Sequence, residues 1–165
     1  MSGGCSQDGP GHMTGLFRNV EGSPLDPVET WPYEGMVSVI EYGTLRDWQP
    51  LIRHVTEHPW GHVARKLEQY LGHADDNQVT AYFRMVLHQL RANAEAAERN
   101  AVAARVRECI ERSGLSAGDF ATSIGTSASR LSTYARGSVT PSAALILRME
   151  KQAGLLAHTP TPQGA

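Results

Sequence analysis

Apolar residues recur every three or four positions along most of the chain, which is the spacing of an amphipathic helix. The segment from Pro32 to Gly43 opens with proline and closes with glycine, the usual order at helix ends. A Thr-x-x-Asp start at Thr44, close to a capping box, precedes a second helix. The apolar positions of that second helix are Leu45, Trp48, Leu51, Ile52 and Val55. Strand-like alternation is almost absent, so the pattern predicts an all-α fold.

The same spacing predicts two further helices. The third opens at Pro59, ends at Gly72 and carries its apolar stripe on Val63, Leu67, Tyr70 and Leu71. The fourth begins near residues 75–77, where acidic residues favour a helix start. Its stripe comprises Val79, Tyr82, Phe83, Val86, Leu87 and Leu90.

Beyond this stripe, the segment RANAEAAERNAVAARVRECIERSG is rich in alanine, the best helix former, and has no Gly or Pro before Gly114. The fourth helix is therefore expected to continue to about Arg112, a length of roughly 50 Å at ~1.5 Å per residue. It is either one long helix or two coaxial helices with a kink near Asn100. Such a weakly apolar helix is either a solvated connector or a segment that a second copy or a partner stabilises.

The C-terminal part predicts a compact series of short helices. Gly114 stops the long helix, Leu115 is expected to tuck beneath the next one, and Ser116 caps that helix with Asp119 three residues later. Gly125 supplies a tight turn, where a positive φ is cheap. The expected inner positions are Val102, Val106, Cys109, Ile110, Phe120, Ala121, Ile124, Leu131, Tyr134, Leu145, Ile146 and Met149.

Two more boundaries complete this series. Thr126 or Ser127 caps the third short helix, and Gly137 ends it. The last helix starts at Thr140-Pro141.

The segment SGLSAGDFATSIGTSASRLSTYARGSVTPSAALILRME resembles the helix-turn-helix domain of Xre/Cro-type, phage-repressor-like transcriptional regulators. The matching features are Gly114-Leu115-Ser116, Phe120-Ala121, Gly125-Thr126-Ser127, Leu131-Ser132, Tyr134, Gly137 and Pro141-Ser142. Together with SPLDPVETWPYEGMVSVIEYGTLRDWQPLI and HPWGHVARKLEQYL, the chain is similar to an actinobacterial type of these regulators that carries an N-terminal helical domain. The resemblance implies that double-stranded DNA is a partner.

The resemblance also implies a role for each polar residue of the motif. Residues 127–136 would be the recognition helix, lying in the major groove. The residues at base-reading positions are Ala128, Ser129, Arg130 and Thr133. The residues at phosphate-holding positions are Ser116, Ser127, Ser132, Arg136, Ser138 and Thr140. Small hydroxyl side chains let a helix approach base edges and phosphates closely, and arginine can contact guanine through two hydrogen bonds.

The sequence departs from the family pattern at three places. Ala117 stands where many relatives carry a polar contact residue, Ala135-Arg136 replaces a common Glu-Asn pair, and the loop SVTPS lacks the usual Lys or Arg. These departures reduce the expected number of phosphate contacts. We therefore expect moderate affinity from one monomer, with a homodimer supplying the rest.

Composition agrees with a soluble, two-part protein. The chain has 165 residues and a net charge of −2, but residues 98–151 carry a balance of +3 and the remainder −5. The two cysteines, Cys5 and Cys109, form neither a disulfide framework nor a zinc site, and no apolar run reaches the ~18 residues that span a bilayer. The expected location is the cytoplasm, without membrane contact.

The histidines and the tryptophans give weaker indications of a functional site. His54, His58 and His62 are spaced at four residues, but Pro59 interrupts the helix between them, so solvated or capping roles are favoured over a metal site. The tryptophans, Trp31, Trp48 and Trp60, are expected in a core, with a peptide groove as the alternative. No nucleophile–base pairing or phosphate-binding loop is present, so we expect no enzyme activity, no metal and no cofactor.

The sequence thus predicts four regions: a disordered leader (1–30), an N-terminal helical domain for dimerisation or partner binding (31–97), a helix-turn-helix domain (98–155) and a flexible tail (156–165). The expected function is that of a dimeric repressor that binds an inverted-repeat operator. The alternative is an antitoxin or adaptor whose main role is to bind a partner protein, such as a toxin, through the N-terminal domain.

Overall fold

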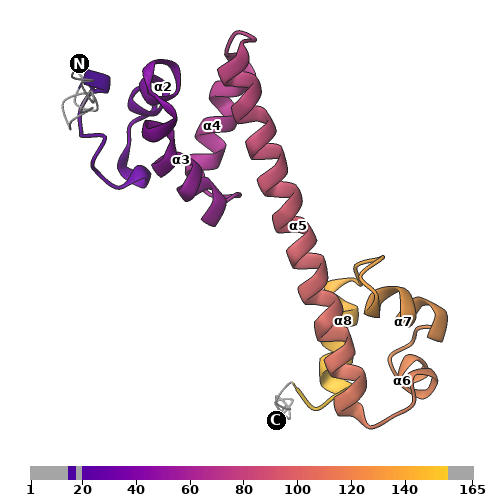
Figure 1. The fold of residues 1–165 in the computed structure, drawn as a ribbon. Helices are drawn as coiled ribbons and strands as arrows, with labels where there is room; N and C mark the ends of the chain where they lie inside the picture. Colours follow the sequence, from indigo (N-terminus) through magenta and orange to yellow (C-terminus); the bar gives the residue numbers. More distant parts are fainter. Residues whose placement is uncertain (1–14, 18–19, 156–165) are drawn as a thin grey trace, which may run out of the picture. The chain divides into compact units, whose positions relative to one another are not determined.

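A computed structural model describes residues 15–17 and 20–155 of the chain. These residues form α-helices and one short 3-10 helix, with no strand in the described ranges, so the all-α prediction is confirmed (Figure 1). The elements are η1 (Val28–Thr30), α2 (Tyr33–Tyr42), α3 (Leu45–Glu57), α4 (His62–His73), α5 (Gln78–Ser113), α6 (Ala117–Ser123), α7 (Ala128–Ala135) and α8 (Ala143–Gln152). The chain divides into two compact units, 1–94 and 95–165.

The N-terminal unit packs η1, α2, α3, α4 and the first part of α5 around one hydrophobic core. Trp31 and Trp48 are buried in it, whereas Trp60 is exposed and lies under the guanidinium of Arg91, 5.1 Å from the ring centroid. Two of the three tryptophans are therefore core residues. The Trp48 ring lies edge-on to Phe83, with the centroids 5.2 Å apart. This contact joins α3 to α5.

The predicted leader is not wholly separate from this core, which corrects the boundary at residue 30. Leu16 and Phe17 are buried, and the Phe17 ring packs against Trp31 with the centroids 5.7 Å apart. The ring also fills the space beside Gly35, where a Cβ would come within 2.7 Å of it. Burying such apolar side chains stabilises the ordered state, and this outweighs the polar composition around them. Residues 1–14 and 18–19 of the leader, and the tail 156–165, lie outside the described residues.

Local chemistry sets the starts of α3 and α4. Thr44 and Asp47 form the predicted capping box, in which the Thr44 backbone N–H donates to the Asp47 carboxylate at 2.7 Å. Leu45, expected in the apolar stripe, is instead 68% exposed because it lies in the first turn, ahead of the packed face. Helix α4 begins at His62, after the cap Gly61, rather than at Pro59, and it continues through the predicted stop at residue 72.

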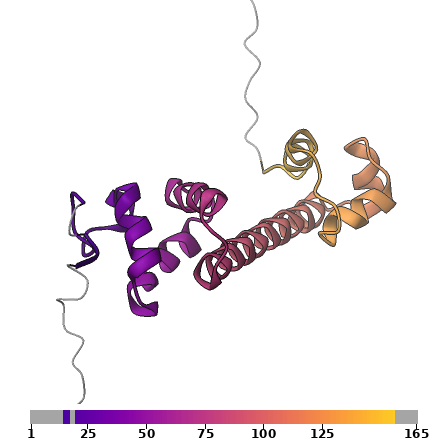
Figure 2. The same cartoon turned by 90° about the horizontal axis from the view of Figure 1, so that it is seen from above.

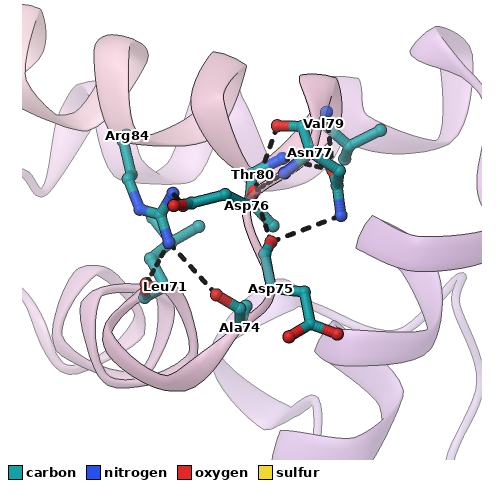
Figure 3. A network of polar contacts seen from close by, with 8 residues as sticks. All are labelled: Leu71, Ala74, Asp75, Asp76, Asn77, Val79, Thr80 and Arg84. Carbon is teal, nitrogen blue, oxygen red and sulfur yellow. Dashed lines mark hydrogen bonds and ion pairs between the residues drawn. The ribbon is translucent and has the colours of Figure 1, made fainter.

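The turn between α4 and α5 is held by side chains that satisfy backbone groups at both helix ends (Figure 3). The Asn77 side-chain oxygen accepts from the amides of Val79, at 2.9 Å, and Thr80, at 3.0 Å. At the end of α4, the Arg84 guanidinium donates to the carbonyls of Leu71, at 2.7 Å, and Ala74, at 3.3 Å. These contacts use the donors and acceptors that helix ends leave unpaired.

Helix α5 is one continuous helix of 36 residues, and no break interrupts it near Asn100 (Figure 2). No residue between Leu87 and Ala103 is buried. The division between the two units falls within this exposed stretch, three residues before the predicted boundary. High alanine content favours the helix there without a packed face.

The C-terminal unit packs the last part of α5 against α6, α7 and α8. Its buried core comprises Val106, Cys109, Phe120, Ala121, Ile124, Leu131, Tyr134, Leu145, Met149 and Ala153. Leu115, expected to tuck beneath α6, is 40% exposed, because it lies between the end of α5 and the cap of α6. Helix α8 begins after the cap Ser142, not at Thr140-Pro141; the Ser142 hydroxyl accepts from the Leu145 amide at 3.3 Å.

Within the described ranges, no helix combines the length and the apolar character that crossing a membrane requires.

Candidate nucleic-acid interface

The segment from α6 to α7 forms a helix, a tight turn and a second helix. Ser116 caps α6: its hydroxyl accepts from the Asp119 amide at 3.2 Å and donates to the Asp119 carboxylate at 2.6 Å. Gly125 adopts a φ of 78° in the turn, a conformation that glycine reaches at little cost. Ser127, rather than Thr126, caps α7 by accepting from the Arg130 amide at 3.3 Å. Helices α6 and α7 pack directly against each other (Figure 1).

All four predicted base-reading residues lie on α7, three of them in its first turn and Thr133 in its second half. Ala128, Ser129 and Arg130 are exposed, while Leu131 and Tyr134 point into the core from the same helix. Thr133 is half-buried, and its hydroxyl donates to the Arg130 carbonyl at 2.7 Å. The helix therefore has one apolar face in the core and one exposed face of small side chains and an arginine.

The predicted phosphate-holding residues are distributed over three places. The six residues are Ser116 at the start of α6, Ser127, Ser132 and Arg136 from the start to the end of α7, and Ser138 and Thr140 in the loop before α8. All six are exposed. The Ser116 and Ser127 hydroxyls act as helix caps, and the Arg136 Nε donates to the Ser132 carbonyl at 3.3 Å. The structure thus places Ser132 within α7 and Ser127 and Arg136 at its two caps, while the other three lie at the start of α6 and in the loop before α8.

Two arginines outside the predicted set contact the ends of these helices. Arg107 of α5 donates through Nη1 to the Ala135 carbonyl, at 2.5 Å, at the end of α7. Arg148 of α8 donates through Nη1 to the Ile124 carbonyl, at 3.2 Å, at the end of α6. The family resemblance assigns no role to Arg107 or Arg148, because they lie on the neighbouring helices α5 and α8. Neither arginine has a local sequence pattern that predicts its contact.

Charge is unevenly distributed over the C-terminal unit. Arg105 donates to Glu150 at 2.8 Å and to Glu108 at 2.8 Å, and these hydrogen bonds raise the pKa of Arg105. Arg107, Arg130, Arg136 and Arg148 form no ion pair with an acidic side chain in the described part of the chain. Residues 116–148 contain three arginines and one acidic residue. Within α6, α7 and the following loop, Arg130 and Arg136 stand against Asp119, a formal balance of +1.

Other candidate sites have structural roles. The His54 and His58 rings lie 5.0 Å apart between centroids, whereas His62 Nε2 lies 3.2 Å from the Glu29 carbonyl oxygen. No group of three or more His, Cys, Asp or Glu side chains in the described ranges is arranged to hold a metal ion. Burial raises the pKa of the Cys109 thiol, which packs in the core as a protonated side chain.

A hollow of about 670 Å³ opens on the N-terminal unit between α2, the end of α4 and the start of α5. Tyr70 lines it and donates its hydroxyl to Glu41 Oε1 at 3.1 Å. Burial and this hydrogen bond raise the pKa of Tyr70 to about 12, so the phenol is neutral at ordinary pH.

Comparisons with models of protein families, with curated proteins and with solved structures found no match.

Proposed function

We propose that the protein is a sequence-specific transcriptional regulator that binds double-stranded DNA through α7. The observation that carries this proposal is the exposed face of α7, where Ala128, Ser129 and Arg130 have no covering polypeptide among the described residues. The face opposite is anchored in the core by Leu131 and Tyr134. A rigidly held helix with a slim outer face meets the steric requirement for entering the major groove.

The chemistry of the exposed face supports the same proposal. Arg130 on this face and Arg136 at the end of α7 form no ion pair with an acidic side chain within the described ranges. Their positive charge is therefore available to phosphates or base edges. Arg130 is the residue best suited to read a guanine, because a guanidinium donates two parallel hydrogen bonds to its major-groove edge. The serines and the arginine at the ends of the helices are suited to hold the register by contacting phosphates.

The regulator acts as a homodimer in this proposal. One monomer offers few basic side chains on this surface, and each phosphate contact adds a limited, salt-dependent share of affinity. A second monomer doubles the contacts and fixes a two-fold symmetric site. The operator is then an inverted repeat whose half-sites lie about one helical turn apart. Repression follows if this site overlaps a promoter.

Selection from a random double-stranded DNA library tests the proposal. The full-length protein is incubated with the library, and bound duplexes are amplified and sequenced over several rounds at low and at near-physiological salt. We expect enrichment of an inverted repeat, and loss of that enrichment in the double variant Arg130→Ala, Arg136→Ala. Recovery of unrelated sequences by the wild-type protein at both salt concentrations would overturn it.

A second function, partner binding by the N-terminal unit, is favoured by one observation. Tyr42, at the end of α2, and Leu45, at the start of α3, are 72% and 68% exposed. Exposed apolar side chains that gather on one surface are typical of interaction sites, and these two residues lie three positions apart in the chain. In this alternative, which includes the antitoxin role, the N-terminal unit binds a protein such as a toxin, and DNA binding is secondary. Stable co-purification of a neighbouring gene product, with no DNA enrichment, would favour it.

A further inference from the structure

The two helices of the motif end in the same kind of turn, and each turn leaves backbone carbonyls for a side chain to bind. At the end of α7, the amides of residues 136–138 donate to the carbonyls of residues 132–134. The next carbonyl, that of Ala135, accepts from Arg107. Helix ends always leave such acceptors, and burying or crowding them without a donor is costly.

The end of α6 has the same pattern of backbone hydrogen bonds, but its arginine binds a carbonyl one position farther along the turn. The amides of residues 124–126 donate to the carbonyls of residues 120–122, and the Ile124 carbonyl accepts from Arg148. A Cβ at Gly125 would lie 3.5 Å from Arg148 Nη1, an ordinary contact distance, so the guanidinium lies directly beside the turn. A positive charge at a helix C-terminus is also favoured by the helix dipole.

Both arginines lie outside the unit formed by α6, the turn and α7. Arg107 lies on α5 and Arg148 on α8, and neither forms an ion pair with an acidic side chain among the described residues. A hydrogen bond from a charged donor is stronger than one between neutral groups. The guanidiniums therefore tie α6 and α7 to two different helices of the C-terminal unit.

We propose that Arg107 and Arg148 are positioning residues that hold the turn and α7 at the angle needed to read a DNA sequence. This inference rests on the proposed function. Helix α7 has only eight residues, and Arg130 lies roughly 7 Å along the helix from Ala135. A tilt of about 10° about the Ala135 end therefore moves Arg130 by roughly 1 Å. That displacement is large compared with the narrow distance range of a hydrogen bond to a base.

The test compares Arg107→Gln and Arg148→Gln with the charge-matched control Arg112→Gln. Arg112 is an exposed arginine of α5, 3.6 Å from Glu108, and within the described part of the chain it forms no hydrogen bond with α7. Amide hydrogen exchange of the free, full-length protein is measured over residues 127–137. We expect faster exchange at these amides in the first two variants and no change in the control.

The second readout is the ratio of Kd values for a scrambled duplex and the duplex recovered by selection. We expect this ratio to fall by at least about tenfold in Arg107→Gln and Arg148→Gln. The expected size is that of one lost hydrogen bond to a charged group, here the bond from a displaced Arg130 to a base. The slope of log Kd against log salt should stay the same, and Arg107→Lys should restore most of the ratio. Arg112→Gln should leave the ratio unchanged.

Two results would overturn the inference. One is unchanged exchange together with an unchanged ratio. The other is an unchanged ratio with a salt slope lower by about one, which would make the arginine a phosphate contact instead of a positioning residue. If the wild-type protein enriches no DNA, the proposed function fails, and the exchange measurement alone decides whether these arginines hold α7.

Discussion

Gly137, which ends α7, lies directly against Ala103 of α5: a Cβ built on the glycine would be 3.4 Å from the Ala103 Cβ. Gly137 has a φ of 74°, in the left-handed region. Its left-handed conformation therefore disfavours a side chain, while the packing would place a Cβ in van der Waals contact with Ala103. This contact and the hydrogen bond from Arg107 to Ala135 fix the end of α7 on α5.

Gly137→Ala should therefore destabilise the C-terminal unit by about 1–2 kcal/mol, the usual cost of a left-handed conformation for a residue with a Cβ. Gly118→Ala is the matched control, because Gly118 lies in α6 and an added Cβ would approach only the Ser116 hydroxyl, at 3.9 Å. That substitution should stabilise the helix by up to about 1 kcal/mol. Urea unfolding followed by circular dichroism measures both changes. Equal effects of the two substitutions would contradict the strained geometry at Gly137.

The cap at the start of α5 leads to a second prediction. Asn77→Ala removes the acceptor for the Val79 and Thr80 amides and should lower the free energy of unfolding of the N-terminal unit by about 1 kcal/mol. Asn77→Asp keeps an acceptor at the same position and should retain most of the stability. Thermal unfolding of the two variants and the wild type gives the comparison. If Ala and Asp at this position behave alike, the cap contributes nothing measurable.

A third prediction concerns pH. The pKa of Tyr70 is raised from 10.0 to about 12 in the folded protein, so the folded state holds this proton more tightly than the unfolded state. The resulting contribution to stability is fully present below about pH 10 and is lost as the pH rises toward 12. Phenolate absorbance should show one tyrosine that titrates late.

Tyr70→Phe provides the control for this prediction. The variant lacks the titrating hydroxyl, so the late absorbance step should disappear and its stability should fall less steeply over the same pH range. A late step that persists in the variant would assign the raised pKa to another tyrosine.

Much of the fold could be predicted because it depends on local chemistry. The Thr44–Asp47 capping box, the glycine turns after α6 and α7, and the buried stripes of α3 and α7 each have a short-range pattern. The long α5 was also predictable, since alanine-rich sequence without Gly or Pro favours a helix whatever surrounds it.

The sequence-based predictions of the leader and of Leu115 were wrong because tertiary packing outweighed local sequence there. The polar leader contains Leu16 and Phe17, whose burial depends on Gly35 and Trp31 farther along the chain. Leu115, expected to tuck beneath α6, lies in the connection between α5 and α6, which no neighbouring element covers fully. No spacing rule reveals these outcomes.

The candidate interface was predictable only in part, for a similar reason. The alternation of core and surface positions within one helix predicts which residues of α7 are exposed, and the family resemblance implies that Ser129 and Arg130 would read bases. The contacts of Arg107 and Arg148 span 28 and 24 residues and depend on how α5 and α8 pack. Such long-range hydrogen bonds to backbone carbonyls leave no pattern in the side-chain sequence.

The central claim is that α7 lies in the major groove, with Arg130 reading a base and Arg136 holding a phosphate. Protection of guanine N7 from dimethyl sulfate tests it most directly, because that atom faces the major groove. With the duplex recovered by selection, we expect the wild-type protein to protect a guanine in each half-site. Arg130→Ala should lose that protection at saturating protein, whereas Arg136→Ala should keep it and bind all sequences more weakly. Absence of guanine protection by the bound wild-type protein, or protection that Arg130→Ala leaves intact, would contradict this placement of α7.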